Sequence, residues 1–334
     1  MKRLAVALVF ALSLAALPAH AHHGVAAVGL SEPEGPGAAL ETTAALPLPK
    51  HFVFAMVKSE FVSFQMRDRA AFPAQRDFSS FNMVALGFGI TPWLSAYVFQ
   101  PYNVKSEDGG VGSNPGLGDT NLMLAFGWKW DEGPRLIPQK ESLDELADWH
   151  FLLWASCTIP VGPTENSDDR GDHFVPDMQT GFGEPSPALG LAALKQVFTN
   201  LTALAEVNYQ HFFTHRYSFT RYRFGAEMRV NAAGVYRIYA KGRVRLDGVA
   251  ELVGLHLQRD REDDGRCNLA ALSASGGTIL YASLGARLYL GRAAIAFGAK
   301  RAVLKSLNEG SDQQGSEGLE NVRVFLSLSV AGPL

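Results

Sequence analysis

The chain has 334 residues, of which 47% are hydrophobic and 19% charged, with a net charge of −3 and only two cysteines. This composition argues against a basic nucleic-acid-binding protein, a disordered chain and a disulfide-stapled secreted domain. The mean hydropathy of +0.01 is too low for a protein that crosses a membrane with several helices. A globular protein and a transmembrane β-barrel both remain, because the alternating apolar and polar residues of a barrel average out.

The first 21 residues have the three parts of a secretory signal peptide. Lys2 and Arg3 provide the charged start, residues 4–17 are apolar apart from Ser13, and residues 18–21 form a small-residue cleavage site. The apolar run is shorter than the roughly 20 residues that a helical membrane anchor needs. We therefore expect cleavage after Ala21, export, and a mature chain that begins at His22.

Residues 78–104 contain no Asp, Glu, Lys or Arg and are the best candidate for a membrane-spanning helix. Gly87, Gly89 and Pro92 interrupt the run, and residues 90–93 have the composition of a tight turn. On both sides of that turn, large apolar side chains alternate with small or polar ones, which is the period of a strand. The stretch therefore predicts a β-hairpin with one continuous apolar face.

The same alternation recurs along the rest of the chain. We predict twelve strands, at 50–65, 79–90, 93–104, 118–130, 149–162, 181–198, 201–214, 217–230, 234–257, 276–290, 292–306 and 320–331. Tight turns at 91–92, 199–200, 231–234 and 291–292 alternate with long polar connections, and 131–148 is a long connection at the short-turn end. This pattern predicts an all-β, antiparallel up-and-down transmembrane barrel over residues 50–334.

A soluble periplasmic β-sandwich is the alternative, because it also alternates and also turns often. The long strands and their even number favour the barrel, which closes because lipid cannot hydrogen-bond an open sheet edge. The interpretation implies a location in the bacterial outer membrane with lipid as a partner. Aromatic side chains at strand ends are candidates for the interfacial girdles of such a barrel: Phe52, Trp93, Trp128, Trp130, Trp149, Phe198, Tyr209, Phe212, Tyr289 and Phe297.

Charged side chains in two neighbouring segments keep a single strand parity. We expect that parity to face the lumen, because a charge on the lipid face costs about 2–4 kcal/mol at the membrane midplane. Such a lining could select solutes by charge and favour anions; a salt-bridge network that fills a narrow interior, with Glu206, Asp247 and Glu251 opposite, is the alternative. The candidate lumen residues are Arg221, Arg223, Glu227, Arg229, Lys241, Arg243 and Arg245.

No constellation of catalytic residues stands out, so the sequence favours a non-enzymatic protein. His150 and Ser156 lie on one predicted strand at about 3.3 Å per residue, too far apart for a catalytic dyad. Neither a phosphate-binding loop nor a clustered zinc site is present, so no cofactor is expected. Cys157 and Cys267 can form a disulfide after export or remain separate thiols.

The predicted mature N-terminus is a candidate copper or nickel ligand. His22 supplies an α-amine and an imidazole, and His23 follows directly, although a polar start with no ligand is the alternative. Residues 31–49 contain four of the 17 prolines and show no long alternation. We interpret residues 22–49 as an N-terminal extension that acts as a tether or a plug.

Several motifs resemble an outer-membrane β-barrel transporter family associated with meta-pathway phenol degradation. They are the His-His-Gly start at 22–24, residues 87–95 as a periplasmic hairpin, Gly116–Asp119 opening a strand, 159–164 ending one and 181–186 starting the next. The resemblance implies an outer-membrane location and transport of small, often aromatic, molecules, and it carries no established binding residues. The chain differs from the usual barrel pattern in ending Val330-Ala331-Gly332-Pro333-Leu334, without a terminal aromatic residue.

The function predicted from these features is passive diffusion of small solutes, aromatic or anionic, through an outer-membrane channel. One alternative is a structural barrel that anchors a periplasmic electron-transfer or metal-resistance protein at residues 131–148. A second alternative is an outer-membrane metal-binding protein that uses His22 and His23.

Overall fold

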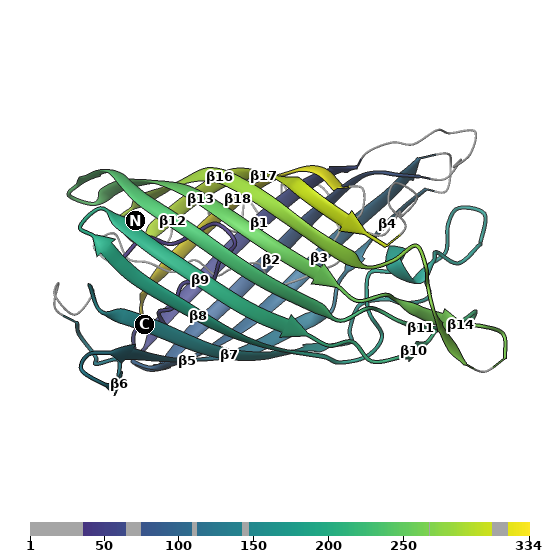
Figure 1. Ribbon diagram of the computed structural model, residues 1–334, viewed down its shortest axis with the longest axis horizontal. Helices are drawn as coiled ribbons and strands as arrows, with labels where there is room; N and C mark the ends of the chain where they lie inside the picture. The colour runs from purple at the N-terminus through teal and green to yellow at the C-terminus, as the bar shows by residue number, and fades with distance from the viewer. Residues whose placement is uncertain (1–35, 65–74, 109–111, 142–146, 267, 309–319) are drawn as a thin grey trace.

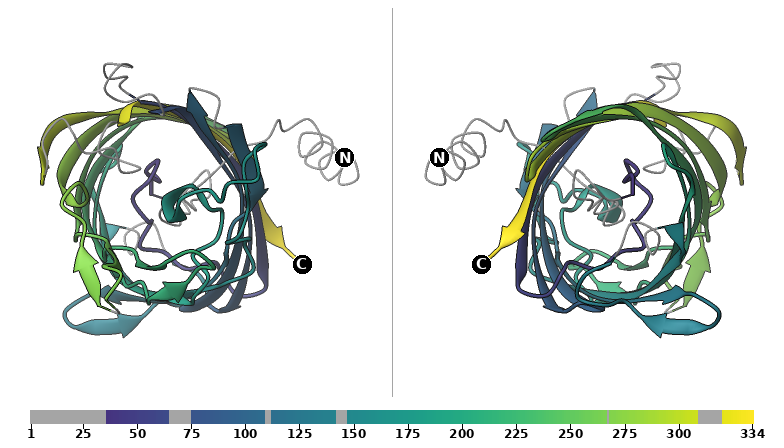
Figure 2. Two further views of the ribbon diagram at one scale, coloured as in Figure 1. Left: turned by 90° about the vertical axis from the view of Figure 1, so that its right-hand side faces the viewer. Right: turned by 90° about the vertical axis from the view of Figure 1, so that its left-hand side faces the viewer.

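The computed structural model describes residues 36–64, 75–108, 112–141, 147–266, 268–308 and 320–334. Twelve long antiparallel strands form the wall of a closed barrel, since β1 pairs with β18 and β3 pairs with β5 (Figures 1 and 2). The twelve strands are β1 (Phe52–Phe64), β2 (Gln75–Thr91), β3 (Leu94–Asp108), β5 (Thr120–Trp130), β7 (Trp149–Ile159), β8 (Ser186–Phe198), β9 (Leu201–Gln210), β12 (Glu227–Lys241), β13 (Val244–Leu257), β16 (Gly277–Leu290), β17 (Ala293–Leu307) and β18 (Glu320–Pro333). The predicted fold class is confirmed.

Short elements decorate the two ends of the barrel. β4 (Gly112–Leu117) pairs with the end of β3, and β6 (Pro134–Leu136) pairs with the end of β5. A separate four-stranded sheet contains β10 (His215–Arg216), β11 (Arg221–Arg223), β14 (Arg261–Asp263) and β15 (Leu269–Ala271). A 3-10 turn, η2 (Pro176–Met178), lies in the connection between β7 and β8.

The two ends of the barrel differ in the length of their connections. Two-residue turns join β2 to β3, β8 to β9, β12 to β13 and β16 to β17 at the end where β1 begins and β18 finishes (Figure 1). The opposite end carries the long connections and the four-stranded sheet. In outer-membrane barrels the short turns face the periplasm, so we call these the periplasmic and the extracellular ends.

One predicted hairpin was misplaced. Residues 231–234, predicted as a tight turn, lie inside β12, and the turn falls at Gly242 and Arg243, where Gly242 has a φ of 59°. The predicted strand 217–230 is divided between β11 in the extracellular sheet and the start of β12. The predicted total of twelve strands is nevertheless right. The segment 217–230 counts β11 and the start of β12 as one strand, and 234–257 counts the end of β12 and all of β13 as one strand.

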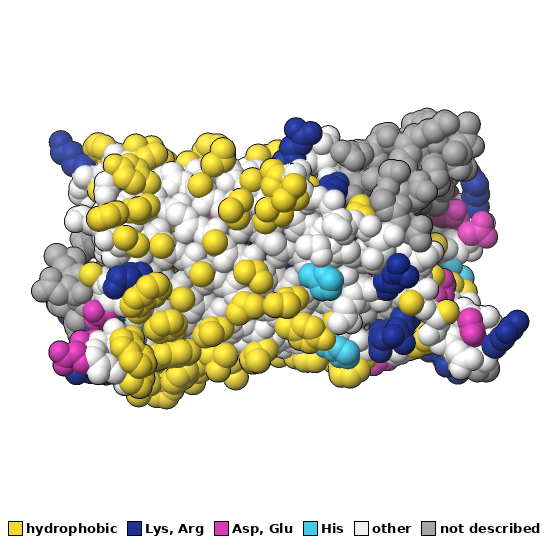
Figure 3. Space-filling model, in the orientation of Figure 1, with side chains coloured by type: hydrophobic (Ala, Val, Ile, Leu, Met, Phe, Trp, Pro, Cys, Tyr) yellow, Lys and Arg dark blue, Asp and Glu magenta, His cyan; other side chains and the backbone are white. Residues whose placement is uncertain are grey.

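The outer wall of the barrel is apolar. On the face seen in Figure 3, hydrophobic side chains cover much of the wall, and charged side chains gather toward the two ends. The exposed fraction reaches 70% for Leu284, 60% for Phe297 and 56% for Leu124, all on the outward parity of their strands. Within the described residues, no helix is long and apolar enough to cross a membrane.

The Leu284→Arg variant tests whether this wall contacts lipid. Leu284 lies near the middle of β16, opposite Ala250 on β13 and Ala299 on β17, so an arginine there faces the hydrocarbon core. We expect a loss of about 2–4 kcal/mol in the free energy of folding into lipid vesicles. Urea titration of folding into vesicles measures it, and Leu284→Ala is the size control. An equal midpoint for the two variants contradicts a lipid-facing position.

Aromatic side chains form a band at the periplasmic end of the wall. Trp93 packs against Phe126, and Trp128, Phe151 and Trp149 continue the row with ring centroids 5.5–6.1 Å apart. Exposed aromatic rings at this level suit the membrane interface. Two predicted girdle residues do not lie in such a band: the side chains of Phe212 and Tyr289 are each only 1% exposed, because both point away from the outer surface.

Candidate functional site: the barrel interior

A segment of the N-terminal extension lies inside the barrel. Residues 36–49 are almost entirely buried, and Figure 2 shows this purple stretch within the ring of strands. Near its start, Gly37 donates its N–H to Thr202 close to the periplasmic end of β9; near its end, Leu48 donates to Ser95 at the start of β3. The segment therefore rises from the periplasmic end to mid-barrel and returns, and we call residues 36–49 the luminal segment.

Two wall carboxylates hold the apex of the luminal segment. Glu251 on β13 accepts the backbone N–H groups of Glu41 and Thr42 at 2.9–3.2 Å. Glu206 on β9 accepts both the N–H and the hydroxyl of Thr43, at 2.8 and 3.0 Å. These bonds satisfy backbone donors that would otherwise be buried without a partner. The Glu41 side chain in turn forms an ion pair with Lys300 on β17, 3.0 Å away.

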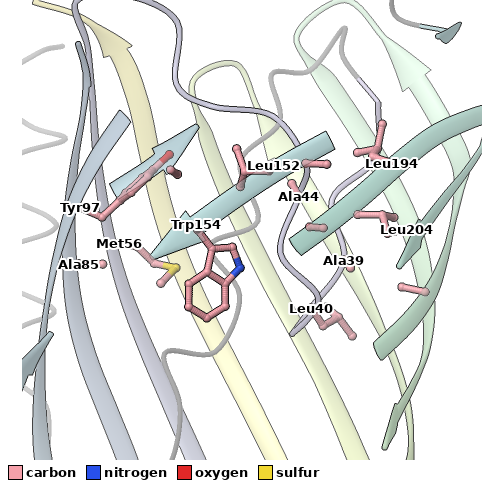
Figure 4. Packing of buried hydrophobic residues seen from close by; sticks show 14 of the residues in the cluster. Ala39, Leu40, Ala44, Met56, Ala85, Tyr97, Leu152, Trp154, Leu194 and Leu204 are labelled. Atoms are coloured by element: carbon pink, nitrogen blue, oxygen red, sulfur yellow. The ribbon is translucent and has the colours of Figure 1, made fainter. Parts of the chain in front are cut away.

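Apolar contacts fix the same segment against the wall. Leu40, Ala44 and Leu48 belong to one buried cluster with Leu152 and Trp154 of β7 and other wall side chains (Figure 4). Leu40 is 3% and Leu48 2% exposed, so each contributes about 1.5–3 kcal/mol through burial alone. The periplasmic half of the lumen is therefore filled by packed protein.

Ion pairs line the opposite wall. Arg323 on β18 binds Glu60 on β1 at 2.8 Å and Glu320 at 2.7 Å, and Lys58 lies 2.6 Å from Glu60. All four side chains are at most 7% exposed. Because a buried charge is tolerated only with a partner, this network belongs to the structure of the wall as well as to its electrostatics.

The connection between β7 and β8 folds inward at the extracellular end. Its backbone carbonyls accept bonds from the wall: Lys105 Nζ donates to Asp177 and Gln179, and the amide of Asn114 donates to Met178 at 2.7 Å. Met178 and Gln179 are fully buried, and η2 lies inside the ring of strands in Figure 2. This loop narrows the extracellular mouth.

Above the apex of the luminal segment lies a polar pocket that opens to solvent; the space free of protein atoms in it, open solvent included, is about 650 Å³. One side is formed by amide-bearing and hydroxyl side chains of β5, β7, β9 and β12, and the other by the charged wall of β1, β17 and β18. The side chains that line the cavity are Glu41, Glu60, Asn121, Trp154, Ser156, Ala188, Glu206, Asn208, Gln210, Arg229, Asn231, Val253, Lys300 and Arg323.

Three of the seven predicted lumen residues face the interior. Glu227 and Arg229 form an ion pair at 3.0 Å near the extracellular end of β12, and Arg245 binds Asp247 through two hydrogen bonds of 2.6–2.7 Å. Arg245 also lies over the ring of Tyr289, 5.1 Å from its centroid, beside Gly37 of the luminal segment. Only Arg229 of the three lines the cavity.

The other four residues were wrongly placed. Arg221 and Arg223 lie on β11 in the extracellular sheet, where Arg221 binds Asp263 at 2.8 Å. Lys241 and Arg243 are exposed beside Gly242 in the periplasmic hairpin. Strand parity misplaced Arg221 and Arg223 because a strand outside the membrane can carry charges on either face. It misplaced Lys241 because a bulge between Arg237 and Tyr239 shifts the register of β12.

A separate small hydrophobic core stabilises the four-stranded extracellular sheet. Phe212, Tyr217, Tyr222 and Phe224 are buried together, with Phe182 packed against them. Burial and the neighbouring Asp260 carboxylate raise the pKa of Tyr222 far above its ordinary value, so its hydroxyl remains protonated and donates to Asp260 at 2.7 Å. Asp260 also accepts the N–H of Gly225, which fixes the point where the chain enters β12.

The structure also places the other candidate residues. His150 Nε2 contacts Glu141 at 3.0 Å, with Nδ1 next to the carbonyl of Asp148, so it does not pair with Ser156. Cys157 is a free thiol, while Cys267, His22, His23 and the predicted signal peptide 1–21 lie outside the described residues. Among the described residues, no group of three or more His, Cys, Asp or Glu side chains is arranged to hold a metal ion.

Comparison with solved structures supports the architecture. The crystal structure of an outer membrane channel from Pseudomonas putida F1 superposes with a TM-score of 0.64 over 86% of this chain and 98% of that one, at 13% identity. The chain therefore has a porin-like outer-membrane β-barrel fold. A NanC porin and a TodX monoaromatic hydrocarbon channel give TM-scores of 0.43 and 0.40 at 8% identity each, with 83% and 86% of this chain covered and 98% and 91% of theirs. No family model matches the chain, and no curated protein matches it in sequence.

Proposed function

We propose that the protein is an outer-membrane channel through which small polar solutes diffuse passively. The observation that carries the proposal is the polar cavity inside a barrel whose outer wall is apolar. A barrel that only anchored a partner could fill its interior with packed side chains, whereas here hydrophilic groups surround open space. The fold likeness to an outer membrane channel is consistent with this role.

The luminal segment makes the resting channel narrow. Residues 36–49 fill the periplasmic half of the interior, so solute passes when this segment moves or is displaced. Its apex depends on two carboxylates, Glu206 and Glu251, and on one ion pair with Lys300. This closure is reversible, because it consists of noncovalent bonds to a wall whose strands pair without it.

The pairing of charges argues against simple anion selection. Three carboxylates and three cationic side chains line the cavity, and each of the cations is within 3.0 Å of a carboxylate: Lys300 of Glu41, Arg323 of Glu60, and Arg229 of Glu227. We therefore propose that the solutes are uncharged and polar, in place of the anions favoured by the sequence pattern.

Liposome swelling tests the proposal directly. Proteoliposomes that contain the full chain should swell in an isotonic solution of a small sugar faster than empty liposomes, and a variant that lacks residues 22–48 should swell faster still. If neither protein changes the swelling rate after correct insertion is verified by heat-modifiable gel migration, the channel proposal is wrong. Anchoring of a periplasmic protein at 131–148 and metal binding at His22 and His23 remain predictions that no observation here favours.

A further inference from the structure

The wall of the cavity carries hydrogen-bond acceptors that the protein leaves unused. The Oδ1 atoms of Asn121 and Asn231 have no hydrogen-bond partner among the described residues, although these side chains are only 6% and 5% exposed and both line the cavity. A buried amide oxygen without a partner costs about 1–3 kcal/mol. Two such atoms facing one cavity indicate a position prepared for a ligand that donates hydrogen bonds.

The two asparagines lie at the two ends of an arc of polar side chains that extends along the wall from β5 to β12. Asn121 on β5 donates to Ser156 on β7 at 3.4 Å, and Asn231 on β12 donates to Glu206 on β9 at 3.4 Å. Asn208, also on β9, donates to the same carboxylate at 3.2 Å. Because their N–H groups already point along the wall, the free oxygens of Asn121 and Asn231 are what the arc offers to a solute.

An aromatic ring lies within this arc. Trp154 extends from β7 into the interior (Figure 4), and its Nε1 donates to Glu206 at 3.1 Å. Gly190 on β8 makes room for the indole, since a Cβ there would lie 2.3 Å from the ring. A tryptophan side chain beside amides and a carboxylate combines an apolar surface with polar groups that can set the orientation of a ligand.

The electrostatics of the arc disfavour anions. Glu206 accepts bonds from Thr43, Trp154, Asn208 and Asn231, all of them uncharged donors, so its negative charge is stabilised but not neutralised. The cations across the cavity are already paired. An anion would meet Glu206 and two amide oxygens without a free cation, whereas hydroxyl groups would satisfy those oxygens.

We propose that this arc, Asn121, Trp154, Glu206 and Asn231, is a binding subsite for an uncharged polyhydroxylated solute, a sugar. The inference rests on the proposed channel function, and it specifies the class of solute. Hydroxyl groups donate to the free amide oxygen at either end of the arc, and the apolar face of the sugar ring lies against the indole of Trp154. The site lies above the apex of the luminal segment, so a solute reaches it from the extracellular mouth before that segment moves.

Saturation-transfer NMR on the detergent-solubilised full chain tests the subsite. Glucose, glucuronate and benzoate serve as probes of matched concentration, and glucose should bind at least about threefold more tightly than either anion. Asn121→Ala and Asn231→Ala should each weaken glucose binding about threefold to tenfold, which corresponds to one lost hydrogen bond. Ser283→Ala removes another buried unpartnered group that does not line the cavity, and it should leave glucose binding unchanged.

The ligand comparison on the unmodified protein needs no variant, so a variant that fails to fold does not affect it. Tighter binding of glucuronate or benzoate than of glucose overturns the subsite, as does unchanged glucose binding in both asparagine variants that fold. Selective glucose binding without glucose-driven swelling of proteoliposomes would contradict the channel and leave the subsite standing. Glucose-driven swelling without any binding preference among the three probes would contradict the subsite and leave the channel standing.

Discussion

Replacing Glu251 by alanine should open the channel. Glu251 is 3% exposed and accepts the N–H groups of both Glu41 and Thr42, so its removal leaves two buried backbone donors without an acceptor. This loss weakens the attachment of the luminal segment by about 2–4 kcal/mol, or about thirtyfold or more in the ratio of attached to released segment. Single-channel recording in planar bilayers should show a corresponding rise in open probability.

The Glu251→Gln variant is the matched control. Its side chain has nearly the same volume and keeps one oxygen that can accept either N–H, so we expect an open probability between those of wild type and Glu251→Ala. The order wild type, glutamine, alanine is specific to a role in holding the segment. Open probabilities that are equal in all three proteins would show that residues 36–49 do not control passage.

Strand parity predicted the barrel but not what fills it. In β16 the apolar residues Leu280, Leu284 and Leu288 alternate with Tyr281 and other inward side chains, and this pattern alone places the outer wall correctly. The luminal segment has no such period. Its contacts join residues 163 and 210 positions apart, such as Thr43 with Glu206 and Glu41 with Glu251, and no local pattern encodes these pairings.

The charged residues show a related limit of sequence reasoning. Arg221 and Arg229 share a parity, but a break in the strand between them separates an extracellular sheet from the membrane wall. Conversely, Arg323 and Arg287 lie on the polar faces of two predicted strands, but each is the only basic residue of its strand, so neither forms a ladder that parity could reveal. Parity identifies the inward face only after the ends of the membrane-spanning strands are known.

The amide arc could not have been found from sequence spacing. Asn121, Ser156, Glu206 and Asn231 come from four strands spread over more than a hundred residues, and the register of the consecutive strand pairs from β5 to β12 places them along one cavity. Asparagine in a strand has an ordinary structural explanation, hydrogen bonding along the wall. Only the unpartnered oxygens in the folded protein distinguish a ligand position from that explanation.

The largest loss of stability is expected from Arg323→Met. Arg323 is 6% exposed and binds Glu60 and Glu320, so its removal takes an ion-pair partner from two buried carboxylates; Glu60 still pairs with Lys58. Breaking one side of a buried ion network costs about 3–5 kcal/mol. Urea unfolding followed by tryptophan fluorescence measures the change in the free energy of unfolding.

Arg135→Met provides the comparison for an exposed pair. Arg135 binds Asp131 at 2.8 Å, but the two side chains are 57% and 36% exposed, so its loss should stay within about 1 kcal/mol. Adding Glu320→Gln to Arg323→Met should recover much of the lost stability, because the penalty comes from the carboxylate that has lost its partner and not from the absent guanidinium itself; Glu60 stays unchanged because it still pairs with Lys58. If Arg323→Met unfolds at the same urea concentration as Arg135→Met, the wall does not depend on this network, and Arg323 is then available to a solute in the cavity.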